Sequence, residues 1–288
     1  MRTTFRARQP YADILLEIAQ NFPCQSKVRP LRFIEKMKKN QGSIAALTGL
    51  GLGEDGLERK NPVIVGLGDS VTAGHFESLL PRDEEKLKTV IVNAMADMAA
   101  GKPAEPIEVT DPRESYLEKF RYLLIDKYER TSVSVINSGI AGDNLKQMSD
   151  RSTRDVIRYR PDLVLINGSL NWDIGMGTAQ VYRNILEDLV DRIKSETEAD
   201  IILLTPNGDL PNTLFGDKDA PIPTTLERVK VIREVAEERQ VSLADVYAVW
   251  EAARDEGCPW EELLANGVNH PGVEGHEAYA ITLMKLME

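Results

Sequence analysis

The chain has few of the residues that most often build metal centres and covalent cross-links. Its 288 residues include only three histidines and two cysteines. Two cysteines are too few for a disulfide framework and indicate a reducing compartment, so we expect a cytoplasmic protein. The histidines His75, His270 and His276 lack the spacing of a zinc-protease motif, so we expect no metal and no cofactor.

The sequence also lacks long apolar runs and an excess of positive charge. No apolar segment approaches the roughly 20 residues of a membrane-spanning helix, and the arginines of residues 1–10 precede no apolar stretch of a signal peptide. The formal net charge of −11 argues against a nucleic acid as partner. The charge is uneven, since residues 1–60 carry eleven basic and six acidic side chains. This segment is a candidate arm for oligomerisation.

From residue 62 onward, strand-like and helix-like segments alternate. Helical spacing of apolar residues lies between short apolar, β-branched runs. This alternation predicts a parallel sheet with helices on both faces, in which ligands bind at the carboxyl ends of the strands. The predicted strands are 63–67, 133–136, 163–166, 201–204 and 241–244.

Two segments fall outside this alternation. Residues 1–41 have helical apolar spacing and a glycine-rich stretch follows them, so we expect residues 1–61 to form an N-terminal helical extension and linker, and residues 62–288 the main domain. Residues 76–111 interrupt the alternation after the first strand and contain a helical piece near 83–99. The insertion is either a lid over a site or a surface excursion.

A Gly-Asp-Ser tripeptide follows the first predicted strand, at residues 68–70. A serine on a tight turn at the end of a buried strand exposes its hydroxyl at the sheet edge where α/β proteins place their sites. The glycines here complete no phosphate-binding motif, since Val71 stands where a dinucleotide fingerprint needs Gly and no Gly-Lys-Ser/Thr is present. The G-x-S-x-G elbow of ordinary α/β-hydrolases is absent too. The alternative interpretation is a turn capped by Asp69.

Further polar segments follow the later strands. Gly142 and Asn171 each lie just beyond a predicted strand, and an Asn-His-Pro occupies residues 269–271. A serine hydroxyl becomes a nucleophile only when a base takes its proton and donors hold the oxyanion. These segments contain residue types that can do both.

In this order, the four segments resemble the sequence blocks of the GDSL/SGNH hydrolase superfamily. The resemblance covers about residues 62–288. It implies a flavodoxin-like three-layer α/β/α fold with a parallel sheet and a serine esterase or deacylase activity. It also implies that Ser70 is the nucleophile and His270 the base. The oxyanion would be bound by the backbone amides of Ser70 and Gly142, and by the carboxamide of Asn171.

Two blocks depart from the family pattern. The third block usually contains Gly-x-Asn-Asp, whereas here Ser169 replaces the Gly and Trp172 stands between Asn171 and Asp173. The last block usually contains Asp-x-x-His-Pro, and here Gly267 occupies the position of the Asp. The acid that normally holds the histidine is therefore missing from its usual place.

Another residue must orient His270, because a neutral histidine base needs an acceptor at its second ring nitrogen. Asn266 stands one position earlier, and a one-residue bulge at Gly267 would bring its carboxamide oxygen to the ring. We therefore predict Asn266 as the orienting residue. Asp245, at the end of the last strand, is the fallback acid, although such a residue is more often a helix cap.

Two functions from different classes stay open. The first is a serine hydrolase of oxygen esters, of the short-acyl esterase or carbohydrate O-deacetylase type, acting on a small-molecule or carbohydrate ester. The second is a catalytically impaired protein of the same fold that binds a ligand. Gly267 and the altered third block motivate the second.

Overall fold

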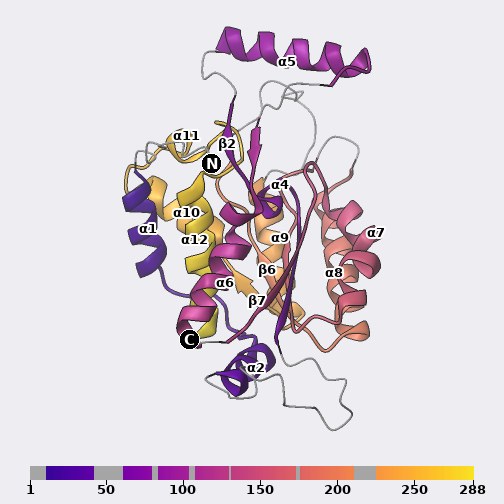
Figure 1. Cartoon of the computed structure of the whole chain (residues 1–288), viewed down its shortest axis with the longest axis vertical. Coiled ribbons are helices and arrows are strands. Elements are labelled where there is room, and N and C mark those ends of the chain that lie inside the picture. The colour runs from indigo at the N-terminus through magenta and orange to yellow at the C-terminus, as the bar shows by residue number, and fades with distance from the viewer. Residues whose placement is uncertain are drawn as a thin grey trace.

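A five-stranded parallel sheet forms the centre of the molecule (Figure 1). The computed structural model describes residues 11–41, 61–79, 84–103, 108–129, 131–172, 176–210 and 225–288. The strands are β1 (Val63–Gly68), β4 (Ser134–Gly139), β5 (Leu163–Asn167), β6 (Asp200–Leu204) and β7 (Ser242–Ala244). They are ordered β4-β1-β5-β6-β7 and every neighbouring pair is parallel. This is the flavodoxin-like strand order, which confirms the predicted fold class.

Helices cover both faces of the sheet, so β1 and β5 are buried at every position. One face packs against α1 (Ala12–Asn21), α6 (Tyr116–Lys127), α10 (Val246–Asp255) and α12 (Val273–Met284). The other face packs against α7 (Leu145–Asp155), α8 (Ala179–Glu196) and α9 (Thr225–Glu238). Among the described helices, none has the length and apolarity to cross a membrane. The shorter helices are α4 (Ser70–Ala73), α11 (Trp260–Leu263), and the 3-10 turns η1 (Pro112–Glu114), η2 (Ile157–Tyr159) and η3 (Lys285–Met287).

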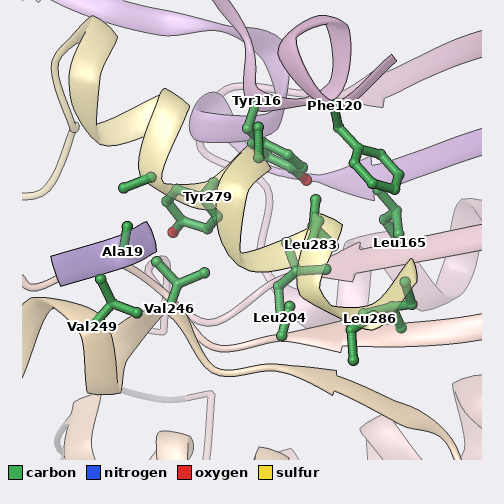
Figure 2. Close-up of a cluster of buried hydrophobic side chains, with 14 of the residues drawn as sticks. Ala19, Tyr116, Phe120, Leu165, Leu204, Val246, Val249, Tyr279, Leu283 and Leu286 are labelled. Carbon is green, nitrogen blue, oxygen red and sulfur yellow. The ribbon is translucent and has the colours of Figure 1, made fainter. Parts of the chain in front are cut away.

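Aromatic rings fill the core on the first of these faces (Figure 2). Tyr116 of α6 and Tyr279 of α12 are fully buried, and their rings stack with centroids 5.1 Å apart. Both helices lie over the sheet, where they meet Leu165 of β5 and Leu204 of β6. Burying one large apolar side chain contributes about 1.5–3 kcal/mol. This packing fixes α12 and, with it, the loop that precedes it.

The N-terminal helices are built into this core. The helices predicted within residues 1–41 are present as α1 and α2 (Leu31–Asn40), while residues 1–10 and the linker over 42–60 lie outside the described ranges. Leu15 and Phe33 are fully buried. The Phe33 amide donates to Asp200 Oδ2 at 2.9 Å, at the start of β6. The two helices therefore complete one face of the main domain.

The insertion at residues 76–111 contains a strand pair and a helix. β2 (His75–Ser78) pairs antiparallel with β3 (Glu108–Thr110), and α5 (Glu84–Ala99) connects them. Figure 1 shows α5 beyond the end of this hairpin, away from the sheet. Residues 80–83 and 104–107 are outside the described ranges. The base of the hairpin follows α4 directly, so the insertion starts beside the predicted nucleophile.

Candidate active site

Ser70 is the first residue of α4 and is separated from the end of β1 by Asp69 alone. Asp69 caps this helix, since its Oδ1 accepts a hydrogen bond from the Val71 amide at 3.0 Å. The turn needs glycine at position 68, because a Cβ there would lie 2.0 Å from Thr72 Oγ1. Burial raises the pKa of Asp69 to about 6. The serine thus stands at the carboxyl edge of the sheet, where the sequence places it, and Asp69 is the cap of the turn.

His270 lies against this serine. Its Nε2 is 2.7 Å from Ser70 Oγ. The histidine belongs to the loop before α12, and the Ala265 amide donates to the His270 carbonyl at 2.7 Å, which closes that loop. At this distance the hydroxyl can transfer its proton to the imidazole. The structure therefore brings together the two residues that the sequence predicts as nucleophile and base.

The second ring nitrogen of His270 faces Glu108, on β3. Glu108 Oε2 lies 2.7 Å from His270 Nδ1. This is hydrogen-bonding distance, although the ring N–H is not aimed straight at the oxygen, as is common in unliganded catalytic sites. Burial alone would raise the pKa of Glu108, but the hydrogen bond and charge of His270, with a hydrogen bond from Asn266, outweigh it and lower the pKa. The carboxylate is therefore ionised at neutral pH.

Asn266 does not make the contact predicted for it. Its Oδ1 accepts the backbone amides of Val268, Asn269 and His270 at 3.0, 2.9 and 2.9 Å. With its oxygen engaged in this turn, the side chain does not form the predicted bulge toward the ring. Its Nδ2 instead donates to Glu108 Oε1 at 3.2 Å. Asn266 thus holds the loop and the carboxylate, and acts on the ring only through them.

Asp245, the fallback acid, belongs to a different part of the structure. It forms an ion pair with Arg233, with Arg233 Nε 2.7 Å from Asp245 Oδ2. It also accepts hydrogen bonds from Thr205 Oγ1 at 3.0 Å and from the Ala248 amide at 3.3 Å, as the N-cap of α10. Asp245 is therefore a structural cap rather than the partner of His270.

Sequence reasoning missed Glu108 because the residue lies in the insertion, far along the chain from His270. The one available clue is the strand-like Glu-Val-Thr at residues 108–110. A strand at the end of an insertion tends to pair with a strand at its beginning, and here Ser78 is opposite Glu108. Which loop such a hairpin touches depends on the tertiary fold, which local sequence does not encode.

The other two histidines lie close to the contact between His270 and Glu108. His75 Nε2 is 3.7 Å from Glu108 Oε2, and the rings of His75 and His270 meet edge to face with centroids 5.1 Å apart. Burial and the nearby charge of His270 lower the pKa of His75. His276 is fully buried, and its Nε2–H donates to the His75 carbonyl at 2.9 Å. Burial lowers the pKa of His276 to about 3, so it is a neutral structural residue.

Gly142 and Asn171 follow the strands on either side of β1. Both β4 and β5 pair with β1, so the three loops emerge at one edge. Gly142 has φ +78°, a conformation that favours glycine. Asn171 Nδ2 donates to the Asp143 carbonyl at 3.0 Å, and an amide nitrogen carries a second hydrogen that can serve a ligand. Asp173 lies outside the described ranges.

The segment that carries this serine, this histidine and the two flanking loops matches a known family. A sequence model described as the GDSL-like Lipase/Acylhydrolase family matches residues 67–278. The chain belongs to this family. It is accordingly an esterase that acts on carboxylic esters.

The esterase is similar in sequence to one relative and in fold to several solved structures. The acetylxylan esterase of Geobacillus stearothermophilus is 27% identical over 173 residues, which cover 57% of this chain and 76% of the relative. The solved lipase/acylhydrolase from Enterococcus faecalis has a TM-score of 0.56 at 22% identity, covering 78% of this chain and 95% of that one. A solved acetylxylan esterase from G. stearothermophilus has a TM-score of 0.54 at 21% identity, covering 78% and 94%. At these identities the solved structures show the shared fold alone.

In this esterase, a buried arginine of α7 ties the site loops together. Arg151 donates to the Asp143 carboxylate at 2.6 Å and to the Ser138 carbonyl at 2.8 Å. It also donates to the Gly68 carbonyl at 3.0 Å, just before the nucleophile. A charged donor holding several acceptors makes a stiff connection. Arg151 therefore fixes the Gly142–Asp143 loop relative to Ser70, a role that the sequence did not reveal.

Proposed function

We propose that this esterase is a serine hydrolase of short-acyl oxygen esters, by a Ser-His mechanism with an oxyanion hole. The observation that carries the proposal is the 2.7 Å contact between Ser70 Oγ and His270 Nε2 at the carboxyl edge of the sheet. The likeness to an acetylxylan esterase supports an acetyl group on a carbohydrate or a similar small alcohol as the substrate.

In the first step Ser70 Oγ attacks the carbonyl carbon, and His270 Nε2 takes the hydroxyl proton. The negative oxygen that forms is held by the amides of Ser70 and Gly142 and by the carboxamide of Asn171. One such donor contributes about 3–4 kcal/mol to transition-state binding. The intermediate then collapses by breaking the bond from its central carbon to the alcohol oxygen, which takes the proton from His270, and the acyl group stays on Ser70 Oγ. Water, activated by His270, releases the acid from Ser70 in the same way.

The competing function, a catalytically impaired binding protein, is motivated by the altered third block and by the absence of a carboxylate at position 267. The second reason is weakened by Glu108, because an ionised carboxylate stands beside His270 Nδ1 from another element. We therefore favour the hydrolase.

A panel of p-nitrophenyl esters tests the proposal. We expect kcat/KM to be highest for the acetate and to fall with longer acyl chains. Turnover should be lost in Ser70→Ala, whose melting temperature should match that of the wild-type enzyme. Turnover that survives Ser70→Ala would contradict the serine mechanism, whereas a preference for long acyl chains would contradict only the short-acyl assignment.

A further inference from the structure

We propose that Glu108, delivered by the β2–β3 hairpin, is the positioning acid of His270 in place of the aspartate that the family pattern puts three residues before the histidine. The inference rests on the proposed Ser70-His270 mechanism and adds its third member. It also gives the insertion at residues 76–111 a role in the chemistry.

The contacts of Glu108 fix its carboxylate in one orientation. Oε2 is 2.7 Å from His270 Nδ1, while Oε1 accepts the Asn266 amide at 3.2 Å. The Glu108 side chain is 14% exposed, and that of His270 13%. When His270 takes the proton of Ser70, the imidazolium that forms interacts with the Glu108 carboxylate more strongly at this shielded place than it would on the surface. The Glu108 side chain thus contacts both His270 and Asn266, the residue that shapes the loop of His270.

The usual position of the acid is occupied by Gly267, which has no side chain that could replace that of Glu108. Gly267 has φ +67°, and a Cβ built there meets no heavy atom within 4 Å. The carboxamide oxygen of neighbouring Asn266 is engaged by three backbone amides. The loop of His270 therefore supplies no acceptor to its own histidine from either residue.

The base of the hairpin is anchored close to the nucleophile, which lets it place the acid reproducibly. The Asp111 amide, at the end of the hairpin, donates to the Gly74 carbonyl at 3.0 Å, directly after α4. The buried His276 ring donates to the His75 carbonyl at 2.9 Å. Both strands are thus tied to the core at this base, and Glu108 lies opposite Ser78 at the other end of the pair.

An acceptor at Nδ1 matters because the imidazole must keep its proton there to accept another at Nε2 from Ser70. A carboxylate also stabilises the imidazolium that forms, which a neutral amide does less well. Replacing Glu108 should therefore slow the chemical step and change its pH dependence, with little effect on the fold.

Glu108→Gln tests this assignment, with Glu77→Gln on the paired strand as the matched control. We expect Glu108→Gln to lower kcat for p-nitrophenyl acetate roughly 10²–10⁴-fold, with the melting temperature preserved. The acidic limb of its kcat/KM profile should move to lower pH, because the protonated histidine loses its carboxylate partner. Glu77→Gln should leave kcat and the pH profile as in the wild-type enzyme.

A second variant returns the carboxylate to the family position. In the Glu108→Gln background, Gly267→Asp should recover part of kcat, since aspartate tolerates a positive φ better than most residues. The inference is overturned if Glu108→Gln keeps kcat within a few-fold of the wild-type value, or if kcat falls while the acidic limb stays in place. Either result in an enzyme whose turnover still requires Ser70 would leave the proposed function intact.

Discussion

At the residue scale, the chemistry depends on groups that each have two tasks. In the proposed mechanism Asn171 is one of them, because its carboxamide donates to the Asp143 carbonyl at 3.0 Å and its second amide hydrogen would serve the oxyanion. Asn266 is another, since its oxygen caps three amides of the His270 loop while its nitrogen holds Glu108. Such residues link the stability of a loop to the position of a reacting group.

Asn171→Ala should separate transition-state binding from substrate binding. We expect kcat to fall roughly 10²–10³-fold while KM changes little, because the donor matters most when the oxygen carries its charge. Steady-state kinetics on p-nitrophenyl acetate would measure both constants. If KM alone rises, Asn171 contacts the bound substrate rather than the oxyanion.

At the element scale, the N-terminal helices belong to the core, although their composition suggested an arm. Residues 27–39 include six basic side chains, and these are compatible with burial because they leave one apolar face of α2 free to pack. Phe33 and Met37 of that face are fully buried, while Lys36 pairs with Asp162, with 2.6 Å between Lys36 Nζ and Asp162 Oδ1. The buried apolar residues of α1 and α2 are therefore covered by this chain itself, and the oligomerisation arm stays a prediction.

Phe33→Ala and Leu31→Ala, both on α2, test this interpretation. Phe33 is fully buried and Leu31 is 66% exposed. Truncating a buried phenylalanine costs about 3–5 kcal/mol, whereas a surface substitution usually stays within about 0.5 kcal/mol. Urea unfolding should therefore show a large loss of the free energy of unfolding for Phe33→Ala only. Equal, small losses in both variants would indicate that α2 does not contribute to the core.

At the scale of the whole molecule, the sequence predicts what depends on regular patterns. The five strands and the parallel sheet follow from alternation along the chain. Because the carboxyl ends of parallel strands meet at one edge, the same pattern predicts that Ser70, Gly142 and Asn171 lie near one another. What the pattern does not predict is a contact made by an irregular insertion. Glu108 reaches His270 through a short antiparallel pair, and Arg151 joins its partners through a buried network.

Covalent labelling by a fluorophosphonate tests the central claim, a nucleophilic Ser70 activated by His270, most directly. The probe reacts with a serine that is made nucleophilic by a base that takes its proton. We predict a single adduct, located by peptide mass spectrometry on Ser70, and no adduct in Ser70→Ala. An adduct on another residue, or ester hydrolysis by a wild-type enzyme that remains unlabelled, would contradict the claim.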